Sequence, residues 1–417
     1  MSEFQAGGRE ERLKKKILDR ALDETVQEIK ILKQRADCFP ELEYFLDLLA
    51  AGREPEVIAA RTGRPVAAVM CLQAPLELFH ALGIHPFKIY GGTQTSQRLS
   101  APQLPAIMCP MLRALLGELQ LDSSGRKDGY LAWVAPTTCD WVVKMEDMME
   151  VCGLAERPPF HRLELPHLKD RPESQERWLE EVYALKGFLL GAVKQKKLKP
   201  KVLAQSMRLY QKCWHVFSAL IDLKREGRLP EIWFMVVTNA FFYDDVERWT
   251  AACEKLLPVF RKQEKKKADI FLAGSPIFFP NLKMLHLLEE AGLSVAMDDM
   301  CSSERLFPGA VNFDDLSEHG LLKALAQRYH QGCLCPTFSD NDRRINNIIA
   351  PAHRDLYRGV VFHVLKGCHP FDLESLTLET RLKASGLKFI KLETDYTSED
   401  GQTLLTRLEA YRSTLAV

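Results

Sequence analysis

Six cysteines stand where a folded chain could bring thiols together for metal chemistry. Cys139 follows an apolar run in "VAPTTCD", Cys301 follows another in "AMDDMCSSER", and Cys368 follows a third in "VLKGCHP". The other three lie shortly before a proline, at the edge of an expected helix or turn: Cys71, Cys109 and Cys335. Structural cysteines usually pack inside an element as small apolar residues, so this placement favours a ligand role.

The spacing of these cysteines favours an iron–sulfur cluster over a zinc ion. Structural zinc sites usually contain close CxxC-type pairs. Here the one close pair is Cys333 and Cys335, with a single residue between them, so Cys333 is an equal chemical candidate to Cys335. Distant thiols that converge from separate loops suit a cluster whose irons take thiolate ligands. Four further cysteines are interpreted as core residues: Cys38, Cys152, Cys213 and Cys253.

Other catalytic signatures are absent from the sequence. No GxxxxGK[ST] phosphate loop, HExxH or GxSxG motif occurs, and no GxGxxG follows an expected strand. His369, next to Cys368, is the candidate for a local proton donor, with a surface histidine or a partner of the metal site as alternatives.

The elements that would position the cysteines alternate between strands and helices. Apolar runs predict strands at residues 85–90, 129–136, 161–166, 231–239, 269–275, 293–299, 359–365 and 387–394. Helical spacing lies between them, at 110–119, 142–152, 282–291, 321–329 and 373–384. This alternation predicts an α/β fold of two Rossmann-like domains with doubly wound parallel sheets. In such sheets ligands bind beyond the carboxyl ends of the strands, where Cys139, Cys301 and Cys368 fall.

The expected organisation has four parts. Residues 1–60 form a helical N-terminal segment, and 61–173 form the first Rossmann-like domain. Residues 174–228 show no strand pattern and form a helical bridge, and 229–417 form the second domain.

Composition limits the class of protein. The 417 residues carry 56 basic and 56 acidic side chains, so no excess of positive charge points to nucleic acid. The sequence shows no hydrophobic signal core and no apolar run of the ~18 residues that a membrane span needs. We therefore expect a cytoplasmic protein with reduced thiols.

The cysteine segments resemble those of the 2-hydroxyacyl-CoA dehydratase and benzoyl-CoA reductase family. The resemblance runs in order from about residue 65 to 412. It rests on "CLQAPLELFHALGIHPFKI" (71–89), "LPAIMCP", "APTTCD", "AGSPI", "LEEAGLSVAMDDMCSSER", "GVVFHVLKGCHPFDLES" and "LETDYTSEDGQTLLTRLEAY". It implies two Rossmann-like domains that hold an iron–sulfur cofactor between them. It also implies a separate ATP-hydrolysing iron–sulfur activator that supplies a low-potential electron.

With six well-placed cysteines, the chain resembles the double-cubane branch of this family. Members of that branch hold an [8Fe-9S] cluster and form homodimers. The resemblance implies that Cys71, Cys109 and Cys139 serve one cubane, and that Cys301, Cys335 and Cys368 serve the other. It favours an iron–sulfur reductase of small molecules. The alternatives are a 2-hydroxyacyl-CoA dehydratase subunit with a [4Fe-4S] cluster and a CoA thioester substrate, a non-enzymatic electron carrier or maturation protein, and a zinc-stabilised scaffold.

Overall fold

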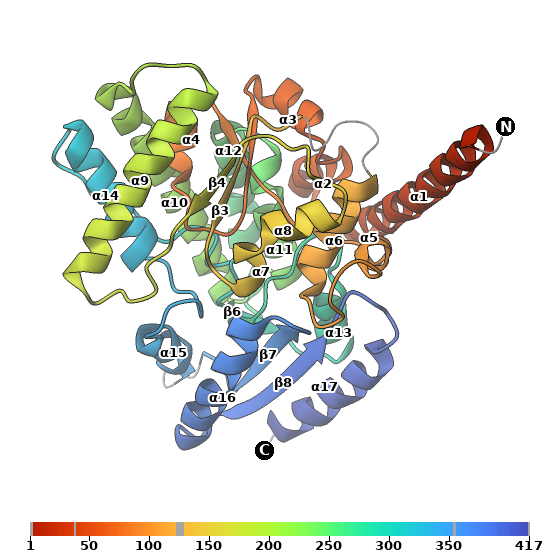
Figure 1. Ribbon diagram of the computed structural model, residues 1–417. Coiled ribbons are helices and arrows are strands. Elements are labelled where there is room, and N and C mark those ends of the chain that lie inside the picture. Colours follow the sequence, from red (N-terminus) through yellow and green to blue (C-terminus); the bar gives the residue numbers. More distant parts are fainter. Residues whose placement is uncertain (1–2, 37–38, 122–128, 353–355, 416–417) are drawn as a thin grey trace.

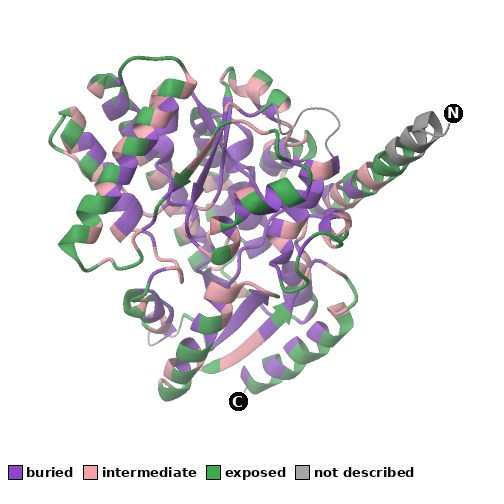
Figure 2. Ribbon diagram, viewed as in Figure 1, coloured by how far each residue is buried: buried purple, intermediate pink, exposed green. Residues whose placement is uncertain are grey.

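The computed structural model describes residues 3–36, 39–121, 129–352 and 356–415. It contains two four-stranded sheets, and every strand pair within them is parallel (Figure 1). Helices cover the sheets, so the predicted α/β class and the two Rossmann-like sheets are confirmed. Most strand residues are buried and the outer faces of the helices are exposed, as Figure 2 shows, whereas the strands at Phe160–Leu163 and Lys388–Thr394 are partly exposed.

The first sheet has the strand order β2-β1-β3-β4. Its strands are β1 (Val66–Val69), β2 (His85–Lys88), β3 (Ala132–Pro136) and β4 (Phe160–Leu163). Its crossovers contain α4 (Leu76–Ala81), α5 (Gln94–Ser100), α6 (Pro110–Leu121), α7 (Asp140–Val143) and α8 (Met145–Val151). The chain moves from β1 to one side and then returns to the other, so the topological switch point lies between β1 and β3.

The second sheet repeats this plan with the order β6-β5-β7-β8. Its strands are β5 (Ile270–Gly274), β6 (Val295–Asp298), β7 (Gly359–Leu365) and β8 (Lys388–Thr394). The accompanying helices are α13 (Lys283–Glu290), α14 (Glu318–Gln331), α15 (Asp342–Ile349), α16 (His369–Ala384) and α17 (Gly401–Leu415). The switch point of this sheet lies between β5 and β7.

Helices connect the two sheets and precede the first. The connection is formed by α9 (Pro172–Ala192), α10 (Pro200–Arg225), α11 (Glu231–Asn239), η2 (Ala240–Tyr243) and α12 (Val246–Arg261). The N-terminal segment contains α1 (Glu3–Ala36), η1 (Pro40–Leu42), α2 (Glu43–Ala50) and α3 (Pro55–Thr62). Helices are therefore found where the helical N-terminal segment and the bridge were predicted. The largest hydrophobic core contains buried residues of both sheets and of α10, α11 and α12.

Helix α1 leaves the body of the molecule at its N-terminal end (Figure 1). Its C-terminal half contacts both domains. The Glu24 carboxylate accepts from the backbone amides of Gln94 and Thr95 at the start of α5, at 2.7 and 2.9 Å. Arg35 forms an ion pair with Glu289 of α13 at 2.8 Å. This half of α1 therefore bridges the two domains.

The strand predicted at residues 231–239 is wrong, because this segment is the helix α11. All nine of its residues are buried. A helix enclosed on every side shows a continuous apolar run without a polar face, and a short run of this kind is indistinguishable from a buried parallel strand. The real first strand, β1, was not predicted, because "VAAV" is short and contains two alanines.

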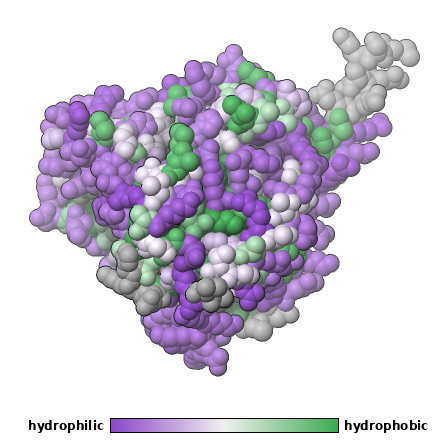
Figure 3. All heavy atoms as spheres, turned by 90° about the horizontal axis from the view of Figure 1, so that it is seen from below, coloured by the Kyte–Doolittle hydropathy of each residue, from purple (hydrophilic) through white to green (hydrophobic). Residues whose placement is uncertain are grey.

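None of the helices in the described ranges combines the length and the apolar character of a membrane span. The face seen in Figure 3 is mostly hydrophilic, with hydrophobic side chains gathered in a hollow near its centre.

Candidate metal centre

Seven cysteines line one cavity of about 110 Å³ between the two domains. They are Cys71, Cys109, Cys139, Cys301, Cys333, Cys335 and Cys368. All six predicted candidates are therefore brought to one place, together with the alternative Cys333. Cys38 lies outside the described residues, and the three other cysteines interpreted as core residues are buried elsewhere: Cys152, Cys213 and Cys253.

The first domain delivers two of these thiols at its switch point. Cys71 lies two residues beyond β1, and Cys139 follows β3 and caps the start of α7. The Sγ of Cys71 is 3.0 Å from the hydroxyl oxygen of Thr138. Cys71 has a φ of +59°, a backbone conformation that costs a non-glycine residue about 1 kcal/mol or more. Such strain is typical of sites where the direction of one side chain matters.

Cys109 and Cys368 bring the two domains into contact. Cys109 lies just before α6, Cys368 follows β7 and caps α16, and their thiols form a hydrogen bond. Gly367 has a φ of +75°, and a Cβ atom there would lie 1.8 Å from the carbonyl oxygen of Ile107. Glycine is therefore required for this close approach. The indole of Trp141 also donates to the carbonyl oxygen of Gly367 at 2.9 Å.

Cys301 follows β6, and the loop after α14 contributes two more thiols. Both Cys333 and Cys335 line the cavity, so the choice between them stays open. Arg305 donates to the carbonyl oxygen of Leu334 and Lys169 donates to that of Cys333. The side-chain amide of Gln73 lies 3.5 Å from the Sγ of Cys333. These bonds hold the loop against the segments that carry Cys71 and Cys301.

The thiols fall into two neighbourhoods that cross the domain boundary. Cys368 interacts with Cys109 and Cys139, whereas Cys301 interacts with Cys333 and Cys335. Cys71 interacts with both Cys139 and Cys301 and so lies between the two groups. The assignment of one cubane to each half of the chain stays a prediction, and these neighbours favour a partition that mixes the halves.

Three cationic side chains surround the thiols. Lys88 is buried, and its Nζ donates to the carbonyl oxygen of Cys301 at 3.2 Å and lies 4.8 Å from the centre of the Phe278 ring. Arg305 and Lys169 interact electrostatically with both Cys333 and Cys335. The Nη2 of Arg305 has no hydrogen-bond partner within the described part of the chain. Cations at a buried or half-buried site stabilise an anionic group between them.

The protonation of the thiols follows from their burial. Burial raises the pKa of Cys139 to about 11 and that of Cys333 to about 12. Burial also raises the pKa of Cys71 and Cys335. The pKa of Cys368 is raised first by the hydrogen bond with Cys109 and then by burial. These thiols therefore hold their protons at neutral pH. Because a metal is bound by the thiolate form, metal binding must release these protons.

The spread of the sulfur atoms suits a cluster better than one ion. Around a single zinc ion, thiolate sulfurs ~2.3 Å from the metal lie about 3.8 Å apart. Among the described residues, the cysteines form no group of three whose ligand atoms all lie within 4.8 Å of one another. Sulfur ligands of a multi-iron cluster lie further apart, because each binds a different iron. The donor set, its spacing and its cationic surroundings thus fit an iron–sulfur group.

Comparison with known proteins identifies the family of the chain. The family model of the 2-hydroxyglutaryl-CoA dehydratase D-component matches residues 71–415, from the first cavity cysteine to the last described helix. The chain belongs to this family.

Named relatives of the dehydratase family support the assignment along most of the chain. The putative dehydratase subunit YjiM of Escherichia coli is 26% identical over 375 residues, covering 84% of this chain and 91% of that protein. The (R)-phenyllactyl-CoA dehydratase beta subunit of Clostridium sporogenes is 21% identical, covering 85% and 93%. The (R)-2-hydroxyglutaryl-CoA dehydratase subunit beta of Acidaminococcus fermentans is 22% identical, covering 84% and 92%.

One residue of this dehydratase-family site was missed from the sequence. Arg344 of α15 is 2% exposed and pairs with Asp299, beyond β6, and with Glu374 of α16. It therefore connects the segment of Cys301 to the helix that Cys368 caps. The only sequence signal is its position beside Ile345 and Ile348 on the buried face of a short amphipathic helix.

The predicted proton donor lies beside the cavity of the dehydratase-family chain rather than in its wall. The ring of His369 is 5.6 Å from that of Trp141, and Trp141 is a lining residue whereas His369 is not. Its role stays a prediction.

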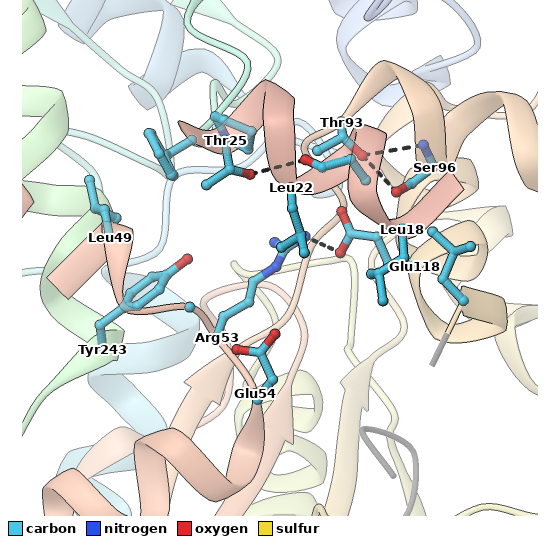
Figure 4. Close-up of a pocket in the computed structure, with 15 residues that line it drawn as sticks. Leu18, Leu22, Thr25, Leu49, Arg53, Glu54, Thr93, Ser96, Glu118 and Tyr243 are labelled. Atoms are coloured by element: carbon cyan, nitrogen blue, oxygen red, sulfur yellow. Dashed lines mark hydrogen bonds and ion pairs between the residues drawn. The ribbon is translucent and has the colours of Figure 1, made fainter. Parts of the chain in front are cut away.

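A second crevice in this dehydratase-family fold lies under α1 (Figure 4). Leu18, Leu22 and Thr25 line it from α1, opposite the ion pair of Arg53 and Glu118. No described cysteine lines it, and Arg53 also donates to the carbonyl oxygen of Tyr90 at 2.6 Å. These contacts hold α1 against the first domain.

Proposed function

We propose that this chain binds an iron–sulfur cluster in the seven-cysteine cavity and acts as the reductase component of a two-component system. An ATP-hydrolysing activator protein supplies the low-potential electrons, and the substrate is a small molecule. The observation that carries the proposal is the convergence of seven thiols on one cavity that Lys88 and Arg305 also line. The partner activator explains why the sequence contains no phosphate loop of its own.

The number of thiols favours a double cubane, [8Fe-9S], over one [4Fe-4S] cluster. A single cubane takes about four cysteine ligands, which would leave three cavity thiols unused. The neighbourhoods favour Cys109, Cys139 and Cys368 as ligands of one cubane. Cys71, Cys301 and either Cys335 or Cys333 then serve the other. A bound cluster would supply electrons of low potential.

The protein side chains stabilise and shield this group. Lys88, Lys169 and Arg305 offset the negative charge that thiolates bring into a buried site. Phe278, Phe371 and Met111 line the cavity and exclude water from it. His369 is the candidate that donates a proton at the edge of the cavity. We also propose a homodimer in the cytoplasm, where the thiols stay reduced.

The second candidate is a 2-hydroxyacyl-CoA dehydratase subunit, which the names of the relatives favour. This protein would hold a [4Fe-4S] cluster, act on a CoA thioester and pair with a different subunit. Both candidates need the activator. A non-enzymatic electron carrier would take up electrons without turnover of either substrate class.

The test is an anaerobic assay of the purified chain with an activator of the family, ATP and a reductant. Activator- and ATP-dependent reduction of small molecules supports the reductase. Conversion of an (R)-2-hydroxyacyl-CoA to the enoyl-CoA supports the dehydratase. The variants Cys109→Ser and Cys368→Ser should lose the visible absorption of the cluster, whereas Cys152→Ser, outside the cavity, should keep it. Full absorption in all three variants would contradict the site.

A further inference from the structure

A second group of metal-ligand side chains lies apart from the thiol cavity. His80, near the end of α4, faces Asp245 and Glu247 at the start of α12, and their ligand atoms lie within 4.8 Å of one another. The Nε2 of His80 is 3.7 Å from a carboxylate oxygen of Glu247. Asp245 is buried and Glu247 is half-exposed, so the group reaches the surface.

The hydrogen bonds around His80 fix its tautomer. The hydroxyl of Ser206 donates its one proton to the carbonyl oxygen of Glu77 at 2.8 Å. The Nδ1 of His80 lies 3.1 Å from the same hydroxyl oxygen, so this nitrogen must be the donor. In the neutral ring the Nε2 then carries a lone pair and no proton. Metal-binding histidines are oriented by this kind of bond at the other ring nitrogen.

The Nε2 of His80 faces the carboxylates of Asp245 and Glu247. This atom is shielded from solvent and has no hydrogen-bond partner among the described residues. An imidazole nitrogen without a hydrogen-bond partner beside two carboxylates is an arrangement that suits a metal cation.

We propose that His80, Asp245 and Glu247 bind a divalent transition-metal ion, with zinc the best fit. An imidazole with two carboxylates is a donor set that suits zinc, whereas magnesium and calcium prefer oxygen alone. Zinc ligands ~2.0–2.1 Å from the metal lie about 3.3 Å apart in a tetrahedron, close to the observed 3.7 Å. Water completes the coordination on the exposed side.

Arg64 lowers the affinity of the proposed site for zinc. Its Nε lies 3.6 Å from Asp245, and its Nη1 donates to the carbonyl oxygen of His80 at 3.2 Å. The guanidinium offsets one of the two carboxylates, and the N-terminus of α12 adds positive charge. The site therefore binds zinc less tightly than a cysteine site does. Its consequence is structural, because the ion ties α4, which follows the Cys71 loop, to α12 of the helical connection.

The test compares metal contents of iron-loaded protein dialysed against a buffer of fixed free zinc. The wild type is expected to hold about one zinc per chain more than Glu247→Gln and His80→Asn, with unchanged iron. Glu254→Gln is the matched control, because this glutamate also lies on α12 and is 42% exposed. Zinc should also raise the melting temperature of the wild type and of Glu254→Gln, but not of Glu247→Gln.

Equal zinc in the wild type and Glu247→Gln, with equal thermal shifts, would overturn the zinc site. Iron is measured in the same samples. If the cluster proposal is wrong, the wild type will contain no iron, and this result is independent of the zinc content. If His80→Asn does not fold, the half-exposed Glu247 variant decides alone.

Discussion

The Nη2 of Arg344 lies 2.5 Å from the carboxylate of Asp299, and its Nη1 lies 2.9 Å from that of Glu374. Both acids are buried, and they belong to the segments that carry Cys301 and Cys368. The ion pairs thus fix the distance between two cysteine loops of the second domain.

Removing this cation should loosen the cavity. Arg344→Met leaves two buried carboxylates without their ion-pair partner and should lower the free energy of unfolding by ~3–5 kcal/mol. Iron content should fall with it, and Arg344→Lys should restore part of both. Arg343→Met is the control, because the neighbouring arginine is exposed on the same helix. Urea unfolding and iron analysis measure the two effects; equal results for the two Met variants would contradict this role.

Gly367 tests the contact between the Cys109 and Cys368 loops. Gly367→Ala places a Cβ 1.8 Å from the carbonyl oxygen of Ile107, so one loop must move. Gly386→Ala is the matched control, with a φ of +73° and no atom within 4 Å of the added Cβ. The control should cost ~1–2 kcal/mol of stability from its backbone alone. Gly367→Ala should cost more and lose iron, and the idea fails if its iron content equals that of the control.

Lys88 tests the electrostatic account of the cavity. A buried cation beside the thiols favours the reduced, more negative state of a cluster, so Lys88→Gln should lower its midpoint potential by tens of millivolts. Lys144→Gln should leave the potential unchanged, because its side chain is 68% exposed and its charge is screened by water. Redox titration followed by electron paramagnetic resonance measures both. An unchanged potential in Lys88→Gln would remove the proposed role.

Because His85 is buried, we expect the free energy of unfolding to fall at acid pH. Burial lowers its pKa from 6.5 to about 4, and its Nε2 donates to the carbonyl oxygen of Phe242 at 2.7 Å. Between these two values the unfolded chain binds the extra proton and the folded chain does not. Stability therefore falls as the pH decreases from about 6.5 to 4, by roughly 3 kcal/mol for this group.

The variant His85→Gln can keep the bond to Phe242 and should flatten this part of the pH profile. His215→Gln, at an exposed position, should not. Urea unfolding at pH 7 and pH 4.5 compares them. A profile of His85→Gln as steep as that of the wild type would contradict the assignment.

The sequence predicted the cysteines better than their surroundings. Thiols beyond strand ends could be recognised because parallel strands direct their carboxyl ends to one edge. The helix α11 could not be separated from a strand, since its burial on all sides removes the polar face. Arg344 was missed because ion pairs between distant segments leave no periodic signal. The grouping of the thiols into two neighbourhoods depends on the relative arrangement of the two domains. Local sequence patterns do not determine that arrangement.

The most direct test of the central claim is the content of iron and acid-labile sulfide in protein purified without oxygen. The account predicts about eight irons per chain with a similar amount of sulfide, as a double cubane requires. About four irons would support the single-cubane dehydratase subunit instead. Protein that folds under these conditions with stoichiometric zinc in the thiol cavity and no iron would contradict the account.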